Sequence, residues 1–249
     1  MLSKEKIKLI KSLDQQKFRQ KYNKFTAEGE KTVMELLING RFKAEAVYTS
    51  SITLLQHLKQ KGFEHITHFT EESDIKQISF YKTPSPIVAL FDKPAEPLTS
   101  EFLEKSKIIF LDDVQDPGNV GTILRIADWF GIDAVIRSAG SADFFNPKTI
   151  QSSMGSISNL ETGTSSLSVL HKELKDHIIM GTFMEGTSVY DIKLPQKGIL
   201  VIGHEGKGIH PNHALLCAEK INIPGAASKL AESLNAAVAC SIITSIWVR

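Results

Sequence analysis

The second half of the chain alternates short apolar runs with stretches of helical periodicity. Five of these runs have the length of strands and are bounded by polar or turn-forming residues, at 107–111, 134–137, 177–182, 198–202 and 220–223. A weaker sixth run lies near residues 158–162. Continuous apolar strands separated by helices are typical of a parallel sheet that is buried on both faces. The pattern therefore predicts an α/β domain with a largely parallel sheet.

Residues 232–247 form a segment that is apolar on nearly all sides. Its small residues, Ala236, Ala237, Ala239 and Cys240, would let it pack closely as a helix. A helix of this composition is buried, either in its own core or against another subunit.

The first half predicts a smaller α/β domain of roughly ninety residues. Helical patterns cover residues 3–21, as one or two basic helices, and 30–39 and 52–61, and strand patterns cover 44–49, 65–70 and 86–91. Residues 92–100, with Pro94 and Pro97, interrupt the pattern as a linker does. We therefore expect two domains, residues 1–95 and residues 106–249.

The composition is that of a soluble globular protein, with 42% hydrophobic and 23% charged residues. No apolar run approaches a membrane span, and the first residues carry mixed charge instead of an apolar signal core. We therefore expect a cytoplasmic protein. Cys217 and Cys240 form no CxxC pair and have no clustered histidines nearby. They are predicted to be free thiols, with neither a zinc site nor a disulfide framework.

Basic residues concentrate near the N-terminus, although the formal net charge is only +1. Residues 1–43 contain eleven lysines and arginines against five acidic residues. Such a region is compatible with a phosphate-backbone partner. It is equally compatible with a solvated, lysine-rich helix face.

The first candidate site follows the strand at 107–111. An acidic loop leads to the turn Pro117-Gly118, and an apolar helix containing Arg125 comes next. This order indicates a ligand site at the carboxyl end of a strand. Two ordinary alternatives remain. Thr122, Arg125 and Asp128 share a stripe and could form an exposed face with an Arg125–Asp128 pair, and Asn119 could be a simple N-cap.

The second candidate site is the segment 203–208, which has three glycines after the strand at 198–202. Glycines let the backbone approach a ligand closely, and the Glu205 carboxylate would accept hydrogen bonds from ligand hydroxyl or amine groups. The glycine spacing matches neither the Walker pattern nor the dinucleotide pattern. The alternative is a glycine-rich turn with an exposed glutamate.

The third candidate site follows the strand at 220–223. Pro224 ends this strand, a loop of small residues follows, and Ser233 and Asn235 come at the start of the last predicted helix. Serine and asparagine are common capping residues, so this segment indicates a site only in combination with the other two.

Together and in this order, the three segments resemble the motifs of the SpoU (TrmH-like) family of RNA ribose 2′-O-methyltransferases, in the SPOUT superfamily. Residues 119–125 are similar to the first motif, 201–208 to the second and 223–235 to the third. The N-terminal half is similar to the family's substrate-binding domain, particularly at residues 17–19 and 25–29. The resemblance implies an α/β fold in which a C-terminal parallel-sheet domain contains a deep trefoil knot and follows a small α/β substrate-binding domain.

The resemblance also implies an activity, the transfer of a methyl group from S-adenosylmethionine to a ribose 2′-hydroxyl of structured RNA, with ribosomal RNA favoured over transfer RNA. It implies a homodimer that binds no membrane and no metal. It assigns activation of the hydroxyl to Arg125, with positioning by Asn119, Glu205, Ser233 and Asn235. The implied cofactor contacts are Thr182, Gly203, Ile223 and Leu234, and the implied RNA contacts are Lys17, Arg19 and Arg41.

Arg125 has two conceivable roles. The hydroxyl must lose its proton at or near the transition state, yet a guanidinium stays charged under ordinary conditions. Arg125 either orients the adjacent phosphate and stabilises the developing alkoxide as a cation, or it releases a proton transiently in a desolvated pocket. The energetics favour the first role.

Two positions depart from the family pattern. Gly225 stands where methionine is common, in a longer loop before Ser233, and Gln151 replaces a commonly basic residue. An alternative function is therefore a non-catalytic RNA-binding or ribosome-assembly protein with a degenerate cofactor pocket. A third is a nucleotide-binding enzyme that uses residues 203–208. Because all the implied polar site residues are present, we favour an active enzyme.

Overall fold

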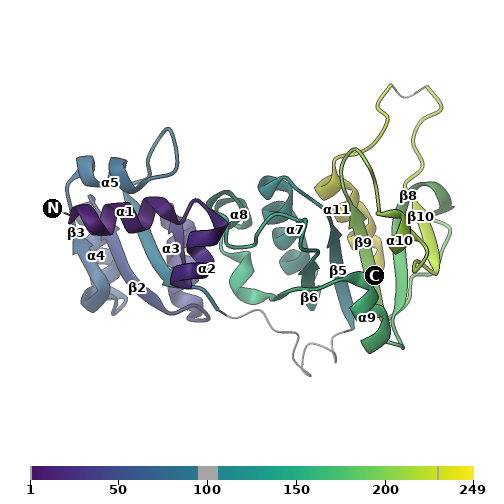
Figure 1. The fold of residues 1–249 in the computed structure, drawn as a ribbon, viewed down its shortest axis with the longest axis horizontal. Helices are drawn as coiled ribbons and strands as arrows, with labels where there is room; N and C mark the ends of the chain where they lie inside the picture. The colour runs from purple at the N-terminus through teal and green to yellow at the C-terminus, as the bar shows by residue number, and fades with distance from the viewer. Residues whose placement is uncertain (1, 95–105, 229) are drawn as a thin grey trace. The chain divides into compact units, whose positions relative to one another are not determined.

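The computed structural model describes residues 2–94, 106–228 and 230–249, which form two compact units (Figure 1). The first unit consists of Met1–Ala95 and Asp143–Ser158, and the second of Glu96–Ala142 and Asn159–Arg249. The predicted domain 106–249 therefore includes a segment that packs with the first unit. Residues 95–100 of the predicted linker lie outside the described residues.

The first unit contains a four-stranded sheet in the order β1-β4-β2-β3. The strands are β1 Lys24–Glu28, β2 Ala44–Thr49, β3 Thr67–Phe69 and β4 Ile87–Asp92. Strand β4 is antiparallel to both β1 and β2, and β3 is parallel to β2. The sequence pattern predicted all of these strands except β1, whose short segment mixes charged and apolar residues.

The helices of this unit are α1 Lys4–Ser12, α2 Gln16–Tyr22, α3 Glu30–Asn39, α4 Ile52–Gln60, α5 Glu72–Ile78 and α8 Pro147–Ser153. One face of the sheet is covered by α1 and α5, which bury Ile10, Ile75 and Ile78 against β2 and β4. Helices α3 and α8 pack against β1. Helices α5 and α8 were not predicted.

Arg19 holds the segment after Ala142 to the first unit. Its side chain is 2% exposed, and its Nε donates to Oδ2 of Asp143 at 2.8 Å. Its NH1 donates to the carbonyl oxygens of Leu13 and Asp14. The prediction that Arg19 contacts RNA is therefore wrong for this structure, because the guanidinium is buried and is bonded to Asp143 and to two carbonyl oxygens within the first unit. Lys17 and Arg41 are exposed, and their contact with RNA stays a prediction.

The second unit contains a six-stranded sheet in the order β10-β8-β9-β5-β6-β7. The strands are β5 Lys107–Asp112, β6 Ala134–Arg137, β7 Glu161–Thr164, β8 Ile178–Ser188, β9 Gly198–Gly203 and β10 Glu219–Asn222. All five neighbouring pairs are parallel. The predicted parallel sheet is confirmed.

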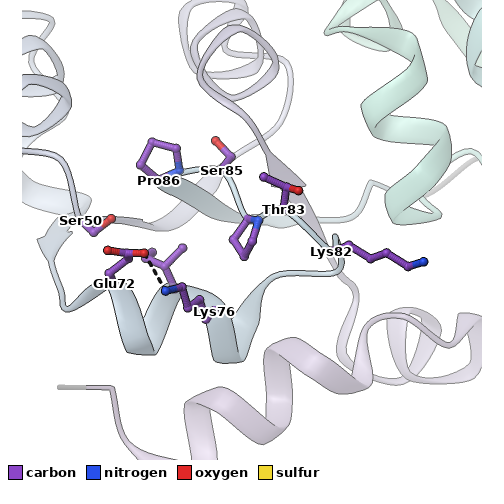
Figure 2. A pocket seen from close by; sticks show the side chains of 9 residues that line it. Ser50, Glu72, Lys76, Lys82, Thr83, Ser85 and Pro86 are labelled. Carbon is purple, nitrogen blue, oxygen red and sulfur yellow. Dashed lines mark ion pairs between the residues drawn. The ribbon is translucent and has the colours of Figure 1, made fainter.

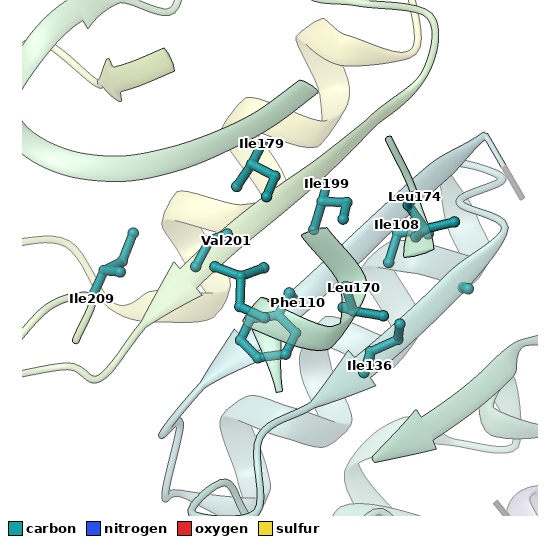
Figure 3. Packing of buried hydrophobic residues seen from close by; sticks show 11 residues of the cluster. Ile108, Phe110, Ile136, Leu170, Leu174, Ile179, Ile199, Val201 and Ile209 are labelled. Atoms are coloured by element: carbon teal, nitrogen blue, oxygen red, sulfur yellow. The ribbon is translucent and has the colours of Figure 1, made fainter. Parts of the chain in front are cut away.

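Helices cover both faces of this sheet, so consecutive residues of β5 are buried. Ile108 and Phe110 pack on one face with Leu167 and Leu170 of α9 Leu167–Glu173 (Figure 3). Beside them, α10 Pro211–Ala214 contributes Ala214 to the same cluster. Two further helices, α7 Pro117–Trp129 and α11 Ala236–Trp247, pack against each other and contact β6 and β9 respectively (Figure 1).

Two boundaries differ from the predictions. Helix α11 begins at Ala236 and not at residue 232, because Asn235 is its N-cap. Strand β8 continues to Ser188, six residues beyond its predicted end, and pairs there with β10. Within the described residues, no helix has the length and apolar character needed to cross a membrane. In the same residues, no three or more acidic, histidine or cysteine side chains are grouped so that they could hold a metal ion.

Candidate active site at the carboxyl ends of two parallel strands

The first two predicted segments begin side by side on the parallel sheet. Asp112, the last residue of β5, pairs with Gly203, the last residue of β9. The chain after β5 leads through α7 to β6, on the side of β5 away from β9. Neighbouring parallel strands whose connections diverge in this way leave a crevice at their carboxyl ends, where ligands of α/β proteins bind.

Helix α7 leaves the Asn119 side chain available for other contacts, because Asp116 is the N-cap. The Asp116 carboxylate accepts from the Asn119 backbone N–H at 2.9 Å, and Pro117 fits the first helical turn. The interpretation of Asn119 as a simple N-cap is therefore wrong.

Asn119 joins the three predicted segments. Its Nδ2 donates to Oε1 of Glu205 at 2.8 Å, across 86 positions of sequence. Its Oδ1 accepts from Nδ2 of Asn235 at 2.9 Å, across 116 positions. Asn235 in turn uses its own Oδ1 to cap α11, accepting from the backbone N–H groups of Ala237 and Val238. One amide thus links the loop after β5, the loop after β9 and the start of the last helix.

Arg125 lies on α7, and its charged side chain is not paired with an acidic residue of the described chain. The residue is exposed, and no hydrogen bond or ion pair joins it to any other described residue. Asp128 instead accepts from Nδ2 of Asn159 at 3.3 Å. The Arg125–Asp128 ion pair of the alternative interpretation is therefore absent from the described residues. An exposed guanidinium can contact the phosphate or the developing oxyanion of a bound substrate.

The loop after β9 is a closed turn that presents Glu205. The backbone groups of His204 and Gly208 bond each other in both directions, at 3.1 and 2.8 Å. A Cβ on Gly203 would lie 2.5 Å from backbone atoms of Gly208 and Ile209, so only glycine fits there. The N–H groups of Gly206 and Lys207 donate to Nδ1 of His204. Because these donors are used internally, the turn is a poor phosphate cradle, which argues against the nucleotide-binding alternative.

Asp112 anchors this turn, and the sequence analysis missed it. Its side chain is 1% exposed. Its Oδ2 accepts from the His210 N–H at 2.8 Å, and its Oδ1 hydrogen-bonds Nδ1 of His213 at 2.8 Å. The available signal was a carboxylate ending a continuous apolar strand, but its partners lie 98 and 101 positions later. Asp112 therefore holds the far end of the segment that carries Glu205.

Neither cysteine contacts Asn119, Glu205 or Asn235, although the Cys217 thiol donates to the His213 carbonyl at 3.4 Å. Both are free. Burial, and after it the nearby Asp112 charge, raises the pKa of the Cys217 thiol to about 11, and burial raises the pKa of Cys240 to about 12. Both side chains are therefore neutral thiols near neutral pH.

The model of the SpoU rRNA Methylase family matches residues 106–245, and the model of the MRM3-like substrate binding domain matches residues 4–89. The chain belongs to the SpoU rRNA methylase family.

Individual relatives match this SpoU family member along nearly its whole length. The 23S rRNA (guanosine(2553)-2'-O)-methyltransferase RlmP of Bacillus subtilis (strain 168) is 33% identical over 242 residues, which covers 96% of this chain and 94% of RlmP. A solved TrmH-family structure from Porphyromonas gingivalis is 36% identical, with a TM-score of 0.85 and coverage of 99% and 98%. The AdoMet-bound rRNA methyltransferase of Sinorhizobium meliloti is 25% identical, with a TM-score of 0.85 and coverage of 99% and 95%.

The residues predicted to bind the cofactor lie within β8 (Thr182), at the end of β9 (Gly203), directly after β10 (Ile223) and in the loop before α11 (Leu234). Thr182 is half-buried and donates to the Val201 carbonyl at 3.1 Å, and Gly203 is buried. Ile223 is half-buried just after β10, whereas Leu234 is 47% exposed. Oδ1 of Asn222, the residue before Ile223, is buried and has no partner among the described residues. An amino donor such as that of adenine would satisfy this oxygen, so this edge fits S-adenosylmethionine.

The structure brings some predicted catalytic residues together and leaves others apart. Asn119, Glu205 and Asn235 are linked directly. Ser233 is exposed in the loop before α11, and no hydrogen bond joins it or Arg125 to the linked set within the described residues. The roles of Ser233 and Arg125 therefore stay predictions.

Proposed function

We propose that this protein transfers a methyl group from S-adenosylmethionine to a ribose 2′-hydroxyl of 23S ribosomal RNA. The observation that carries this proposal is the hydrogen-bonded set Glu205–Asn119–Asn235. Arg125 lies on the same helix as Asn119 and has no partner among the described residues. Membership of the SpoU family and the 23S rRNA named as the substrate of RlmP support the reaction and the substrate.

The residues of this chain would position the hydroxyl and stabilise the charge that develops on it. S-adenosylmethionine supplies an electrophilic methyl group. Arg125, a permanent cation, binds the phosphate next to the target ribose and stabilises the oxygen as its proton passes to solvent water. Its exposure and its lack of a partner among the described residues favour this electrostatic role over that of a base, because the role of a base would require a desolvated pocket.

The linked polar set provides orientation. Glu205 accepts a hydrogen bond from Asn119 through one carboxylate oxygen, and the other oxygen is left to accept from a ribose hydroxyl. Ser233, next in the loop to Leu234, completes the polar rim. In-line alignment of the methyl carbon and the 2′-oxygen then supplies much of the rate. Thr182 in β8, Gly203 at the end of β9, Ile223 after β10 and Leu234 before α11 would hold the cofactor.

We further propose a division of labour, with residues 1–95 binding RNA through groups that include Lys17 and Arg41, and residues 106–249 forming the methyltransferase domain. A deep trefoil knot in that domain is supported by membership of the SpoU family. A homodimer is supported by the exposed Trp129 and Val238 on the packed helices α7 and α11. We also propose a cytoplasmic location, which is supported by the similarity to bacterial 23S rRNA methyltransferases such as RlmP.

A direct assay tests the reaction. Purified protein is incubated with methyl-labelled S-adenosylmethionine and unmodified 23S rRNA transcript, and the RNA is digested to nucleosides. We expect the label in one 2′-O-methylated nucleoside. Label in a methylated base would contradict the ribose as the acceptor. Tight binding of S-adenosylmethionine and RNA without any transfer would favour the non-catalytic alternative.

A further inference from the structure

Residues 79–86 of the first unit form a loop that is held by one buried carboxylate. Glu28, at the end of β1, is 4% exposed. Its Oε1 accepts from Oγ of Ser79 at 2.6 Å and from the N–H of Ser85 at 3.0 Å, and its Oε2 accepts from the N–H of Phe80 at 3.2 Å. Three bonds to one buried group fix both ends of this loop.

Further contacts hold the loop from its flanks. The Lys11 ammonium donates to the Ser79 carbonyl at 2.8 Å, and the Tyr81 hydroxyl donates to the Pro147 carbonyl at 3.0 Å. Burial, and after it the Glu28 charge, raises the pKa of Tyr81 well above its ordinary value, so this hydroxyl keeps its proton. The N–H of Ser50 donates to the Pro86 carbonyl at 3.0 Å, which ties the loop to the end of β2.

The loop forms one wall of a pocket of about 410 Å³ between the ends of β2 and α5 (Figure 2). Three hydroxyl-bearing residues, Ser50, Thr83 and Ser85, are among those that line it, together with two lysines, Lys76 and Lys82. None of the described residues lining it is aromatic. Stacking of bases on a protein requires aromatic or planar groups, so this pocket suits a sugar–phosphate segment better than a base.

The two lysines differ in the contacts that their ammonium groups already make within the protein. Lys76 pairs with Glu72 at 2.7 Å on the exposed side of α5, and such surface pairs are weak and screened by salt. Lys82 is exposed and has no partner among the described residues. Figure 2 shows its ammonium on the opposite side of the pocket, directed away from the Glu72–Lys76 pair. Cations on opposite sides suit successive phosphates of one strand better than a single small anion.

From this geometry, we infer that the pocket binds a sugar–phosphate segment of single-stranded ribosomal RNA, with Lys76 and Lys82 contacting phosphates and the hydroxyls facing ribose. The inference rests on the proposed function, because the RNA is the substrate of that reaction. The pocket lies in the part of the chain that matches a substrate-binding domain model. Its loop is fixed before the RNA arrives, which lowers the ordering cost of binding.

Lysine substitutions with a matched control test this site. Lys76→Gln and Lys82→Gln each remove one positive charge from the pocket. Lys59→Gln is the control, since Lys59 is also an exposed helical lysine of the first unit, pairs with Glu64 at 2.7 Å and lies outside the pocket. The affinity for unmodified 23S rRNA transcript is measured between 50 and 200 mM salt, together with kcat, the KM for RNA and the affinity for S-adenosylmethionine.

We expect each pocket variant to reduce the slope of log affinity against log salt by about 0.7 and to raise the KM for RNA about threefold. The control should change neither, and kcat and cofactor affinity should stay at wild-type values in all three variants. Wild-type slopes and KM in both pocket variants would overturn the site while leaving the methyltransferase activity in place. A wild-type protein without transfer activity would instead overturn the proposed function.

Discussion

Two loops of this molecule are each fixed by a buried carboxylate, but the side chains that they present differ in their contacts. One side chain is hydrogen-bonded to a neighbouring residue, and the other has no partner among the described residues. Residues 79–86 are fixed by Glu28 and residues 204–213 by Asp112, both nearly fully buried carboxylates at the ends of strands. In the loop at 204–213 of the parallel-sheet unit, Glu205 accepts a hydrogen bond from Asn119, which in turn accepts one from Asn235. The other loop leaves Lys82 with no partner among the residues that the structure describes.

This difference follows from the tasks proposed for the two loops. Methyl transfer depends on the orientation of the reacting groups, so the side chains themselves must be fixed. Binding of an RNA backbone depends chiefly on positive charge at a suitable place. A fixed main chain carrying exposed lysines is sufficient for that purpose.

The largest effect is expected for Asp112→Ala. The substitution leaves the His210 N–H and the His213 ring without their shared partner, so we expect a loss of about 3 kcal/mol in the free energy of unfolding. Displacement of Glu205 should also lower kcat by up to about 100-fold. Denaturant unfolding and single-turnover methyl transfer measure the two effects.

Asp133→Ala is the matched control. Asp133 accepts from the N–H groups of Ser106 and Lys107 at the opposite end of β5, at 3.1 and 2.9 Å. We expect this control to lose stability and to keep kcat. An equal loss of kcat in both variants would reduce Asp112 to a purely structural residue.

A smaller effect is expected for Glu28→Gln, which disrupts the other loop. The amide offers one acceptor oxygen where the carboxylate offers two, and its NH₂ group faces a donor. We expect a loss of about 1–3 kcal/mol in the free energy of unfolding and a raised KM for RNA, with unchanged affinity for S-adenosylmethionine. A raised KM for RNA accompanied by a comparable loss of cofactor affinity would show that the two loops do not act separately.

The smallest effect on stability is expected for Asn235→Ala, which removes the N-cap of α11 and should cost about 1 kcal/mol. Asn146→Ala removes the N-cap of α8 and should cost a similar amount. Only Asn235→Ala also removes a bond to Asn119, so only this variant should lower the rate of methyl transfer. Equal rates in the two variants would remove Asn235 from the catalytic set.

The fold was largely predictable where local pattern and packing agree. Strands at 107–111, 134–137 and 198–202 are correct to within a residue, because polar or turn-forming residues bound their buried apolar runs. Strand β1 and helix α8 were missed because they are short and owe their structure to contacts with distant segments. The start of α11 was misplaced because several residues before it are capable of capping, and only Asn235 does so.

The site was predictable in its residue types and not in its connections. The order of three segments pointed to Asn119, Glu205 and Asn235, which the structure links. Arginines 19 and 125 look alike in sequence, yet one is buried against Asp143 and the other is exposed. The partner that decides this difference is 124 positions away from Arg19. Asp112 and Glu28 were missed for the same reason.

The central claim, that Arg125 stabilises the charge on a ribose oxygen during methyl transfer, is tested most directly by the single-turnover rate of Arg125→Ala on unmodified 23S rRNA. Affinities for S-adenosylmethionine and RNA are measured in parallel, and Lys172→Ala, an exposed lysine of α9, serves as the control. We predict a rate at least about 100-fold below wild type at saturating cofactor and RNA, with an unchanged rate in the control. A rate within about threefold of wild type would contradict the account, because a factor of three is far smaller than the loss expected from removing a transition-state contact.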